Sequence, residues 1–419
     1  MSKTSIQHER QKQDLGFRNH LKILMLCWEY PPNIIGGLSR HVHGLSVHLA
    51  MMGHEVHVLT AGSGNLSSFE RMEGVFVHRI RPLNEHDDQF LSWVGGLNLA
   101  FAFKGERMEA EIGFDLIHAH DWLVGTAAIV LKESLSLPLL TTIHATEYGR
   151  NNGIHTSMQQ FIHDKEHQLI EEADQIIICS DYMKKELVSI FQMVDKKMAV
   201  IPNGIEPLSI EIEPKEIFPE LNGKKYILSM GRMVQEKGFE TIIKAAIITK
   251  EKKLDIFFVI AGKGPMLETY RRQIIDRKLE DTIAFVGYIN DEQRNALILN
   301  SEIAVFPSLY EPFGIVALET MVLGKPTIVS DTGGLKGIVK HLKTGLLMVP
   351  GDPKSLLEQI DFLIHNPENA QEMGKRGMQI VKSLYGWNRI SSETSRIMED
   401  MLLYKRVNGI EKVESPKNL

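Results

Sequence analysis

Residues 21–60 read LKILMLCWEYPPNIIGGLSRHVHGLSVHLAMMGHEVHVLT, and this stretch decides the fold. Residues 21–27 are apolar except for Lys22, a pattern typical of a strand buried on both faces of a parallel sheet. After Gly36-Gly37, the spacing of apolar residues predicts a helix over residues 38–52. A second strand then follows at residues 55–60. A strand, a helix and another strand in this order indicate an α/β fold.

The same alternation continues along the chain in two series. Further strands of the first series are predicted at residues 75–79, 116–118, 139–143, 175–179 and 198–201. Strands of the second series are predicted at residues 226–230, 256–261, 283–286, 303–306, 327–330 and 346–349. Helices fill the gaps, for instance at residues 239–250 and 291–300. Continuous β-branched runs between helices indicate parallel sheets covered on both faces.

The best domain boundary is Pro202-Asn203-Gly204, where turn residues precede a Pro- and Glu-rich passage. We therefore predict two Rossmann-like, doubly wound domains, over residues 21–204 and residues 205–386. Ligands of such sheets bind beyond the carboxyl ends of the strands. The two domains are accordingly expected to face each other across a cleft.

Composition excludes several classes of protein. The 419 residues carry a formal net charge of -6, which gives no reason to expect a nucleic-acid partner. Residues 1–20 mix both signs of charge and contain no apolar core, so a secretory signal is excluded and a disordered leader is expected. The apolar, loop-like residues 91–103 are too short to span a bilayer and are expected to pack on the core. Cys27 and Cys179 are expected to be buried thiols, and the protein to be cytoplasmic.

The segment SLYEPFGIVALE at residues 308–319 is the most informative for chemistry. Pro312 and Gly314 shape a tight entry into a helix, whose first amides form a ready site for a phosphate. Glu311 precedes this helix and Glu319 lies within it, so both carboxylates can face one ligand and accept hydrogen bonds from sugar hydroxyls.

Two cations follow the first strand of the second series. Arg232 stands next to Gly231, and Lys237 stands next to Gly238, in the turn that opens the following helix. A guanidinium and an ammonium together suit a diphosphate leaving group, whose negative charge grows as the bond to the sugar breaks.

These motifs together resemble retaining glycosyltransferase family 4, which has the GT-B fold. The resemblance rests on the EX7E pattern of Glu311 and Glu319, on GR…EKG at residues 231–238 and on IPNGI at residues 201–205. It covers residues 21 to 400. Among the members of the family, HAHDW at residues 118–122 and TIHATE at residues 142–147 are most similar to glycogen synthase-like proteins.

The resemblance implies a donor site mostly in the second domain. Arg232 and Lys237 match the residues that hold the diphosphate, Glu311 the one that contacts the sugar and Glu319 the one that contacts the ribose. Backbone groups complete this site in the family, and at the matching positions they belong to Phe313, Gly314, Ile315 and Val316 beside the phosphates and to Gly287 and Tyr288 beside the base.

The first domain is implied to complete the site. His144 matches the histidine over the donor sugar, and Gly37 matches the loop that closes over the phosphates. Asp121 and Asn203 fall on the acceptor side. The family also implies that a tail helix over residues 387–405 crosses back to the first domain.

The predicted function is transfer of a hexose, with glucose favoured, from a nucleotide diphosphate sugar to a hydroxyl acceptor, with retention and with no metal or cofactor. Adenine and uracil stay open as the base, and so do glycan, lipid and small-molecule acceptors. Starch and glycogen synthases proper carry a lysine where this chain has Ile34, and they tend to lack the glutamate that it keeps as Glu319. Both departures put strict ADP-glucose:glucan activity in doubt.

Other readings of the motifs remain open. A sugar-nucleotide epimerase or a phosphorylase would share the GT-B fold with different chemistry. A zinc metallohydrolase is suggested by the HxxEH spacing of residues 163–167 and by HAHD at residues 118–121. A nicotinamide dehydrogenase is disfavoured because the first turn lacks GxGxxG. A non-catalytic binding module is disfavoured because all the expected donor residues are present.

Overall fold

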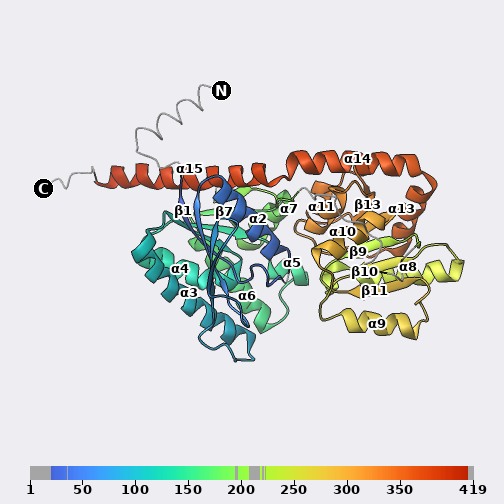
Figure 1. Ribbon diagram of the computed structural model, residues 1–419, viewed down its shortest axis with the longest axis horizontal. Helices are drawn as coiled ribbons and strands as arrows, with labels where there is room; N and C mark the ends of the chain where they lie inside the picture. Colours follow the sequence, from blue (N-terminus) through green and yellow to red (C-terminus); the bar gives the residue numbers. More distant parts are fainter. Residues whose placement is uncertain are drawn as a thin grey trace, which may run out of the picture.

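The protein folds into two lobes that lie side by side, each built around one sheet (Figure 1). The computed structural model describes residues 20–34, 36–193, 197–206, 218, 221 and 223–413. Apart from His20, the predicted leader lies outside the described residues, and so does most of the Pro- and Glu-rich passage after Gly204. The predicted α/β class, with two successive sheets covered by helices, is confirmed.

The first lobe contains an eight-stranded sheet in the order β3-β4-β2-β1-β5-β6-β7-β8. Its strands are β1 (Lys22–Leu26), β2 (Glu55–Ala61), β3 (Phe69–Met72), β4 (Val75–Ile80), β5 (Leu116–His120), β6 (Leu139–Ile143), β7 (Gln175–Ile178) and β8 (Met198–Val200). Every pair except β3 with β4 is parallel. The order runs outward from β1 in both directions, as in a doubly wound sheet.

The second lobe contains a six-stranded sheet in the order β11-β10-β9-β12-β13-β14. Its strands are β9 (Ile227–Met230), β10 (Phe258–Ala261), β11 (Ile283–Gly287), β12 (Ile303–Phe306), β13 (Thr327–Ser330) and β14 (Leu346–Met348). All neighbouring pairs are parallel. The carboxyl ends of β9 and β12 are therefore adjacent, which brings the loops after these two strands together.

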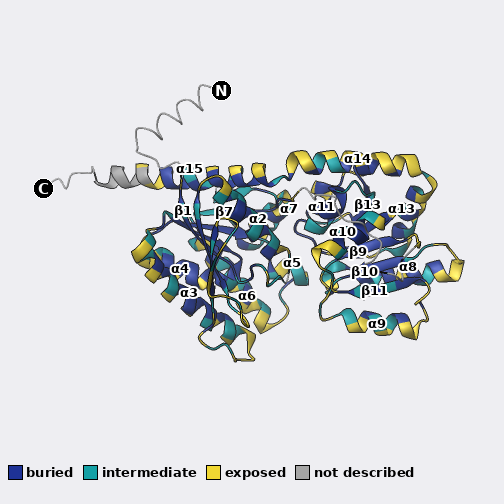
Figure 2. Cartoon of the chain, in the orientation of Figure 1, coloured by how far each residue is buried: buried dark blue, intermediate teal, exposed yellow. Residues whose placement is uncertain are grey.

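Helices cover both sheets, and burial follows this layering (Figure 2). In the first lobe they are α2 (Gly37–Met51), α3 (Phe90–Ile112), α4 (Gly125–Leu135), α5 (Glu147–Asn151), α6 (Ser157–Glu172) and α7 (Asp181–Phe191). Those that follow are α8 (Phe239–Lys252), α9 (Leu267–Asp276), α10 (Asp291–Asn300), α11 (Ile315–Met321), α12 (Leu335–Ile338), α13 (Pro353–His365), α14 (Pro367–Leu384) and α15 (Trp387–Val413). Single turns occur at η1 (Trp122–Val124) and η5 (Gln235–Lys237).

Two elements differ from the sequence prediction. Residues 91–103 were expected as a loop, but they belong to the long helix α3. One of the two glycines that suggested a loop allows close packing instead, since a Cβ atom on Gly96 would lie 1.6 Å from Oδ1 of Asn84. The antiparallel strand β3 was not predicted, because it is short and half of it is exposed at the sheet edge.

The C-terminal helices join the two lobes along one side of the molecule (Figure 1). α14 contacts α11 of the second lobe, and α15 packs on α2 of the first. Trp387 begins α15 and fits against Gly44 and Gly204, where an added Cβ atom would lie 2.2 Å and 2.4 Å from its ring. Because only a glycine leaves room for the indole, these contacts fix where the chain returns to the first lobe.

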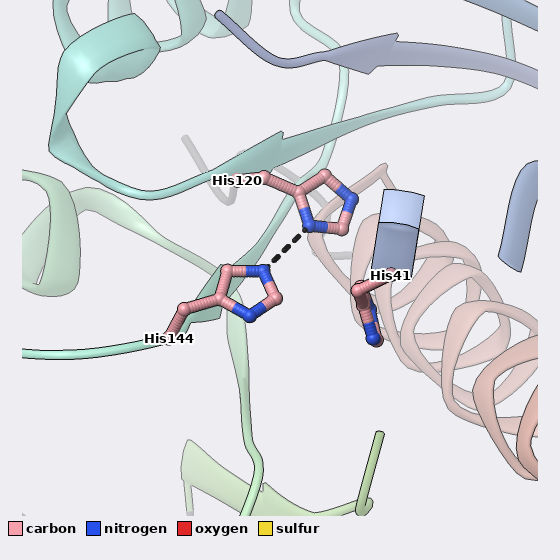
Figure 3. Close-up of side chains that lie close together, drawn as sticks. All are labelled: His41, His120 and His144. Carbon is pink, nitrogen blue, oxygen red and sulfur yellow. Dashed lines mark hydrogen bonds between the residues drawn. The ribbon is translucent and has the colours of Figure 1, made fainter. Parts of the chain in front are cut away.

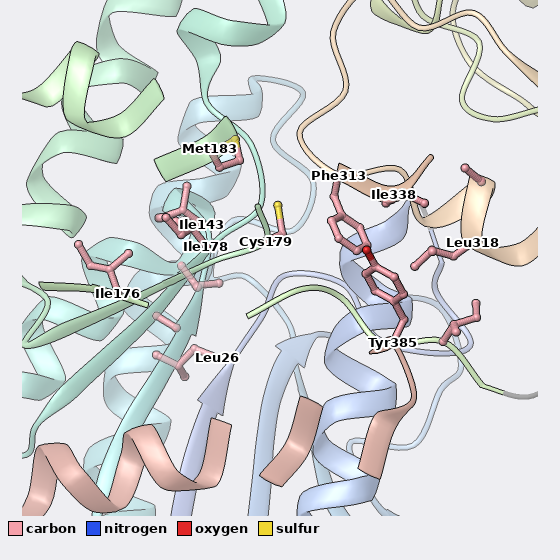
Figure 4. Close-up of a cluster of buried hydrophobic side chains, with 14 of the residues drawn as sticks. Leu26, Ile143, Ile176, Ile178, Cys179, Met183, Phe313, Leu318, Ile338 and Tyr385 are labelled. Atoms are coloured by element: carbon pink, nitrogen blue, oxygen red, sulfur yellow. The ribbon is translucent and has the colours of Figure 1, made fainter. Parts of the chain in front are cut away.

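One hydrophobic cluster continues from the first lobe into the second (Figure 4). Cys179 and Met183 of the first lobe belong to it, together with Phe313 and Leu318 of the second. The Phe313 ring also contacts the Tyr385 ring at 5.9 Å between centroids. The loop that carries the EX7E pattern is therefore anchored by apolar packing.

Both cysteines, Cys27 and Cys179, are buried and free, as predicted. Burial raises the pKa of the Cys179 thiol to about 12. Within the part of the chain that the structure describes, no helix is both long and apolar enough to cross a bilayer.

Candidate functional site

Loops from the carboxyl ends of both sheets contact each other between the lobes. The Tyr310 hydroxyl, after β12, donates to Oε1 of Glu186 at 2.9 Å and accepts from the Thr146 amide at 3.4 Å. The Ser180 hydroxyl donates to the carbonyl oxygen of Pro312 at 2.7 Å. We call the loops after β1, β5, β6, β9 and β12 the facing loops, and they carry most of the predicted site residues.

Lys237 and Glu311 form an ion pair within the facing loops. Nζ of Lys237 lies 2.6 Å from Oε2 of Glu311, and the lysine side chain is 24% exposed whereas the carboxylate is only 8% exposed. Gly238 has a φ of 69°, and a Cβ atom there would lie 2.1 Å from the carbonyl oxygen of Pro307. A glycine is therefore needed to bring the Lys237 turn onto the loop after β12.

Two consecutive glycines that the sequence analysis missed, Gly333 and Gly334, hold the backbone of Glu311. Gly333 has a φ of 52°, and a Cβ atom on it would lie 2.0 Å from the Glu311 carbonyl oxygen. That same oxygen accepts a hydrogen bond from the Gly334 amide at 2.8 Å. The signal that could have revealed this support is the double glycine in SDTGG, directly after the strand β13.

Arg232 is not part of the ion pair between Lys237 and Glu311. Its guanidinium contacts Oε1 of Glu236 at 3.2 Å, and its side chain is 43% exposed. The carbonyl oxygen of Glu236 in turn accepts from the Leu309 amide at 2.8 Å. Arg232 is thus connected to the loop after β12 through Glu236.

The start of α11 faces the start of α2. Gly314 precedes α11, and a Cβ atom on Gly37 would lie 3.0 Å from Cδ1 of Ile315. The amides from Phe313 to Val316 therefore lie where the two lobes approach each other. The Phe313 side chain itself is buried in the hydrophobic cluster.

Glu319 belongs to a different ion-pair group from Glu311. Its Oε1 lies 3.1 Å from Nη1 of Arg294 and 3.7 Å from Nη1 of Arg40 on α2. Arg40 also contacts Asp291 at 2.7 Å across the two lobes. The prediction that both carboxylates face one ligand stays a prediction, and the two arginines that hold Glu319 were missed because they come from separate helices.

Three histidines of the first lobe converge beside these loops (Figure 3). His41 comes from α2, His120 ends β5 and His144 follows β6. Nδ1 of His120 lies 3.2 Å from Nε2 of His144, and the His41 ring meets the His144 ring edge-on at 4.8 Å between centroids. Burial lowers the pKa of His144 to about 3 and holds the pKa values of His41 and His120 well below 6.5.

Asp121 supports His144 through the backbone. It has a φ of 60°, and its Oδ1 accepts a hydrogen bond from the His144 amide at 2.8 Å. Burial raises the pKa of Asp121 to about 6, although the guanidinium of Arg150 acts in the opposite direction. Neither Arg150 nor His41 was singled out from the sequence, because no motif marks them.

The remaining predicted residues lie at the margins of the facing loops. Asn203 is buried beside His41. The Gly287 carbonyl oxygen accepts from the Gly262 amide at 2.7 Å, at the end of β11. Tyr288 is 61% exposed, and Nζ of Lys263 lies 4.8 Å from the centre of its ring.

The HxxEH spacing does not form a metal site. The rings of His163 and His167 both stack on Phe191, at 4.7 Å and 5.2 Å between centroids. Glu166 is buried, and both of its carboxylate oxygens accept a hydrogen bond from the Glu147 amide, at 2.8 Å and 3.1 Å. The imidazoles and the carboxylate between them are therefore directed to different partners.

An apolar groove of about 440 Å³ lies elsewhere on the first lobe, between α3, α4 and α6. Leu91, Trp122 and Phe161 contribute to its lining. Apart from Lys165, its lining is uncharged and contains no imidazole, so the facing loops remain the candidate site for chemistry.

Two family models together match most of the chain. Residues 35–207 match the model described as Glycosyltransferase Family 4. Residues 211–379 match the model described as Glycosyl transferases group 1. The two matched segments follow one another along the chain with a gap of three residues.

Individual proteins match over nearly the whole length. The chain is 34% identical over 391 residues to an uncharacterized glycosyltransferase of Methanocaldococcus jannaschii, covering 90% of this chain and 97% of that protein. It is 33% identical over 394 residues to the glycogen synthase of Mycobacterium tuberculosis, covering 90% and 94%. The sucrose-phosphate synthase of Thermosynechococcus elongatus superposes with a TM-score of 0.80 at 24% identity, covering 93% and 100%. This last likeness shows a shared fold, the predicted GT-B fold.

Proposed function

Because the chain belongs to glycosyltransferase family 4, we propose that it transfers glucose from a nucleotide diphosphate sugar to a hydroxyl acceptor, with retention at the anomeric carbon. The acceptor is a glycan, a lipid or a small molecule, and the reaction takes place in the cytoplasm. The glycogen synthase and the sucrose-phosphate synthase among the similar proteins support the choice of glucose. Epimerase and phosphorylase chemistry become the less favoured alternatives.

The observation that carries this proposal is the contact between Lys237 and Glu311. An ammonium ion and a buried carboxylate 2.6 Å apart present a cation and an acceptor to one ligand. We assign the cation to the donor diphosphate and the carboxylate to the sugar hydroxyls. Arg232, one turn earlier, is assigned to the diphosphate, together with the amides from Phe313 to Val316.

The first lobe provides uncharged groups over the sugar. His144 is neutral at physiological pH because burial lowers its pKa, so one ring nitrogen can donate a hydrogen bond while the other accepts. Asp121 holds the His144 backbone at 2.8 Å and lies on the acceptor side with Asn203. Gly37 lies opposite Ile315, and we assign it to the loop that closes over the phosphates.

The ribose and the base are assigned to the outer part of the site. Arg294 and Arg40 both contact Oε1 of Glu319, so we assign the ribose hydroxyls to Oε2 of that carboxylate. The backbone of Gly287 and Tyr288 is assigned to the base.

The proposed reaction requires no metal or cofactor. The bond from the anomeric carbon to the diphosphate oxygen breaks, and a bond to the acceptor oxygen forms on the same face. The acceptor proton passes to the departing phosphate. Lys237 and Arg232 stabilise the negative charge that grows on this group.

A panel of nucleotide sugars tests the proposal. ADP-glucose, UDP-glucose and GDP-glucose are compared for thermal stabilisation of the protein, because a ligand that binds the folded state raises its apparent stability. The donor that stabilises is then incubated with glycan, lipid and small-molecule acceptors, and the product anomer is determined by NMR. An inverted product, or no stabilisation by any donor, contradicts the assignment.

A further inference from the structure

We propose that His41, His120 and His144 form a binding site for one divalent metal ion of the zinc class. One nitrogen from each of the three imidazoles can be chosen so that all three lie within 4.8 Å of one another. No motif of the sequence brings His41 to the other two, and the function proposed above makes no use of a metal. The site therefore represents an additional property of the protein.

The distances suit a shared metal ion. Two imidazole nitrogens bound to zinc at about 2.0–2.1 Å in tetrahedral geometry lie about 3.3 Å apart. Nδ1 of His120 and Nε2 of His144 are already 3.2 Å apart. Bringing a His41 nitrogen from 4.8 Å to the same separation requires a shift of about 1.5 Å at most.

The hydrogen bonding of these rings is incomplete without a ligand. Within the described residues, neither ring nitrogen of His41 makes a hydrogen bond. His41 is 4% exposed. Leaving a buried polar atom unsatisfied costs about 1–3 kcal/mol. A metal ion bound to one His41 nitrogen would offset that cost for this nitrogen.

The three imidazoles also suit a cation of the zinc class as a donor set. The Asp121 carboxylate follows His120 in the chain and accepts a hydrogen bond from the His144 amide, while the Arg150 guanidinium beside it offsets its charge. Imidazole ligands select zinc and related metals over magnesium or calcium.

Zinc bound to the three histidines should affect sugar transfer, an expectation that rests on the proposed function. His144 is assigned to the donor sugar, so a metal ion bound to its ring competes with the donor. We therefore expect zinc to inhibit transfer and a chelator to restore it. The metal-binding measurement itself does not depend on the protein being a transferase.

Equilibrium dialysis of the full chain against Zn²⁺, after removal of metals with EDTA, tests the site. The expected result is one zinc ion per chain, with affinity reduced about 100-fold or more in His41→Phe and in His120→Gln. The double variant H163Q/H167Q is the matched control, because it removes two imidazoles that stack on Phe191 and leaves the cluster intact. Loss of binding in this control but not in His41→Phe overturns the proposal.

Cobalt spectroscopy on the unmodified protein covers the case in which a variant does not fold. Co²⁺ in a site with three imidazoles and low coordination number gives intense visible bands, whereas octahedral surface sites give weak ones. Intense bands displaced by one equivalent of Zn²⁺ are expected, and weak bands contradict the site. If zinc binds but no donor is turned over, the proposed function fails while the metal site stands.

Discussion

The two lobes bring opposite electrostatics to the facing loops although both build them in the same way, from loops after parallel strands. On the second lobe the functional groups are ionised and paired, as in Lys237 with Glu311 and Arg294 with Glu319. On the first lobe the groups assigned to the sugar are neutral imidazoles, because burial lowers the pKa values of His144 and its neighbours, while the charged Asp121 and Arg40 lie beside them. The second lobe therefore presents charge to the diphosphate, and the first lobe presents uncharged hydrogen-bonding groups to the sugar.

The difference follows from what each side has to hold. A pyrophosphate is an anion, and a partly exposed lysine can meet it without leaving water completely. A sugar is neutral, and a buried ionised group beside it would cost several kcal/mol without a partner. The comparison suggests that phosphate recognition and sugar recognition are divided between the lobes, and the four predictions below test that division.

The largest effect is expected from Lys237→Ala. This change removes the cation assigned to the leaving group, so kcat/KM should fall by about 10³-fold. Lys250→Ala is the matched control, since Lys250 pairs with Asp281 on the outer surface and should leave kcat/KM unchanged. Steady-state kinetics with the preferred donor measure both variants, and unfolding curves establish that each is folded. An equal decrease of kcat/KM in both variants would mean that the overall charge of the protein, rather than the position of Lys237, determines the rate.

His144→Ala should act on turnover more than on donor binding. The neutral imidazole is assigned to the reacting sugar, so kcat should fall by about 100-fold whereas the donor Kd should change by less than about threefold. Calorimetric titration of the donor separates the two quantities. If His144→Ala weakens donor binding but keeps a normal kcat, His144 contributes to phosphate binding rather than to the reacting sugar. Phosphate and sugar recognition would then not be divided between the lobes.

The sequence predicted the charged site residues of the second lobe better than the imidazoles of the first lobe. Lys237 and Glu311 follow β9 and β12, which are adjacent parallel strands, so strand order alone brings their loops together. His41 comes from a helix, and no periodicity in the sequence indicates that its ring reaches His144. The fold followed from apolar runs, whereas residues 91–103 of α3 were predicted as a loop because Gly96, which packs against Asn84, resembles a glycine that breaks a helix.

Acid should destabilise the neutral side selectively. The His144 pKa is about 3 in the folded protein and 6.5 in the unfolded chain, so its contribution to stability is complete above pH 6.5 and is lost as pH falls. Asp121 acts in the opposite sense, because its folded pKa of about 6 exceeds 3.8 and its contribution is lost as pH rises through that interval. Glu166 acts like Asp121, since burial raises its pKa to about 9.

Replacing His144 separates its contribution to the pH dependence of stability from the contributions of Asp121 and Glu166. In His144→Gln, the slope of the unfolding free energy between pH 6.5 and pH 4 should decrease by up to about 1.4 kcal/mol per pH unit. The exposed His365, at the end of α13, provides the control His365→Gln, which should keep the wild-type slope. Urea unfolding at a series of pH values measures all three proteins, and an unchanged slope in His144→Gln would mean that the cluster is not held neutral.

The smallest effect is expected from Arg40→Ala, although Arg40 connects the lobes. Its contact with Asp291 is exposed at 32% and 62%, and such pairs contribute about 0–1 kcal/mol. Its other partner, Glu319, is buried but keeps Arg294 at 3.1 Å, so no carboxylate is left alone. Arg294→Ala is the informative counterpart, because it removes the close partner of a buried charge and should cost about 3 kcal/mol or more. Thermal unfolding measures the stability lost in each variant. If both variants lose the same stability, Glu319 depends on Arg40 of the first lobe as much as on Arg294 of its own lobe. The charged groups of the site would then be shared between the lobes.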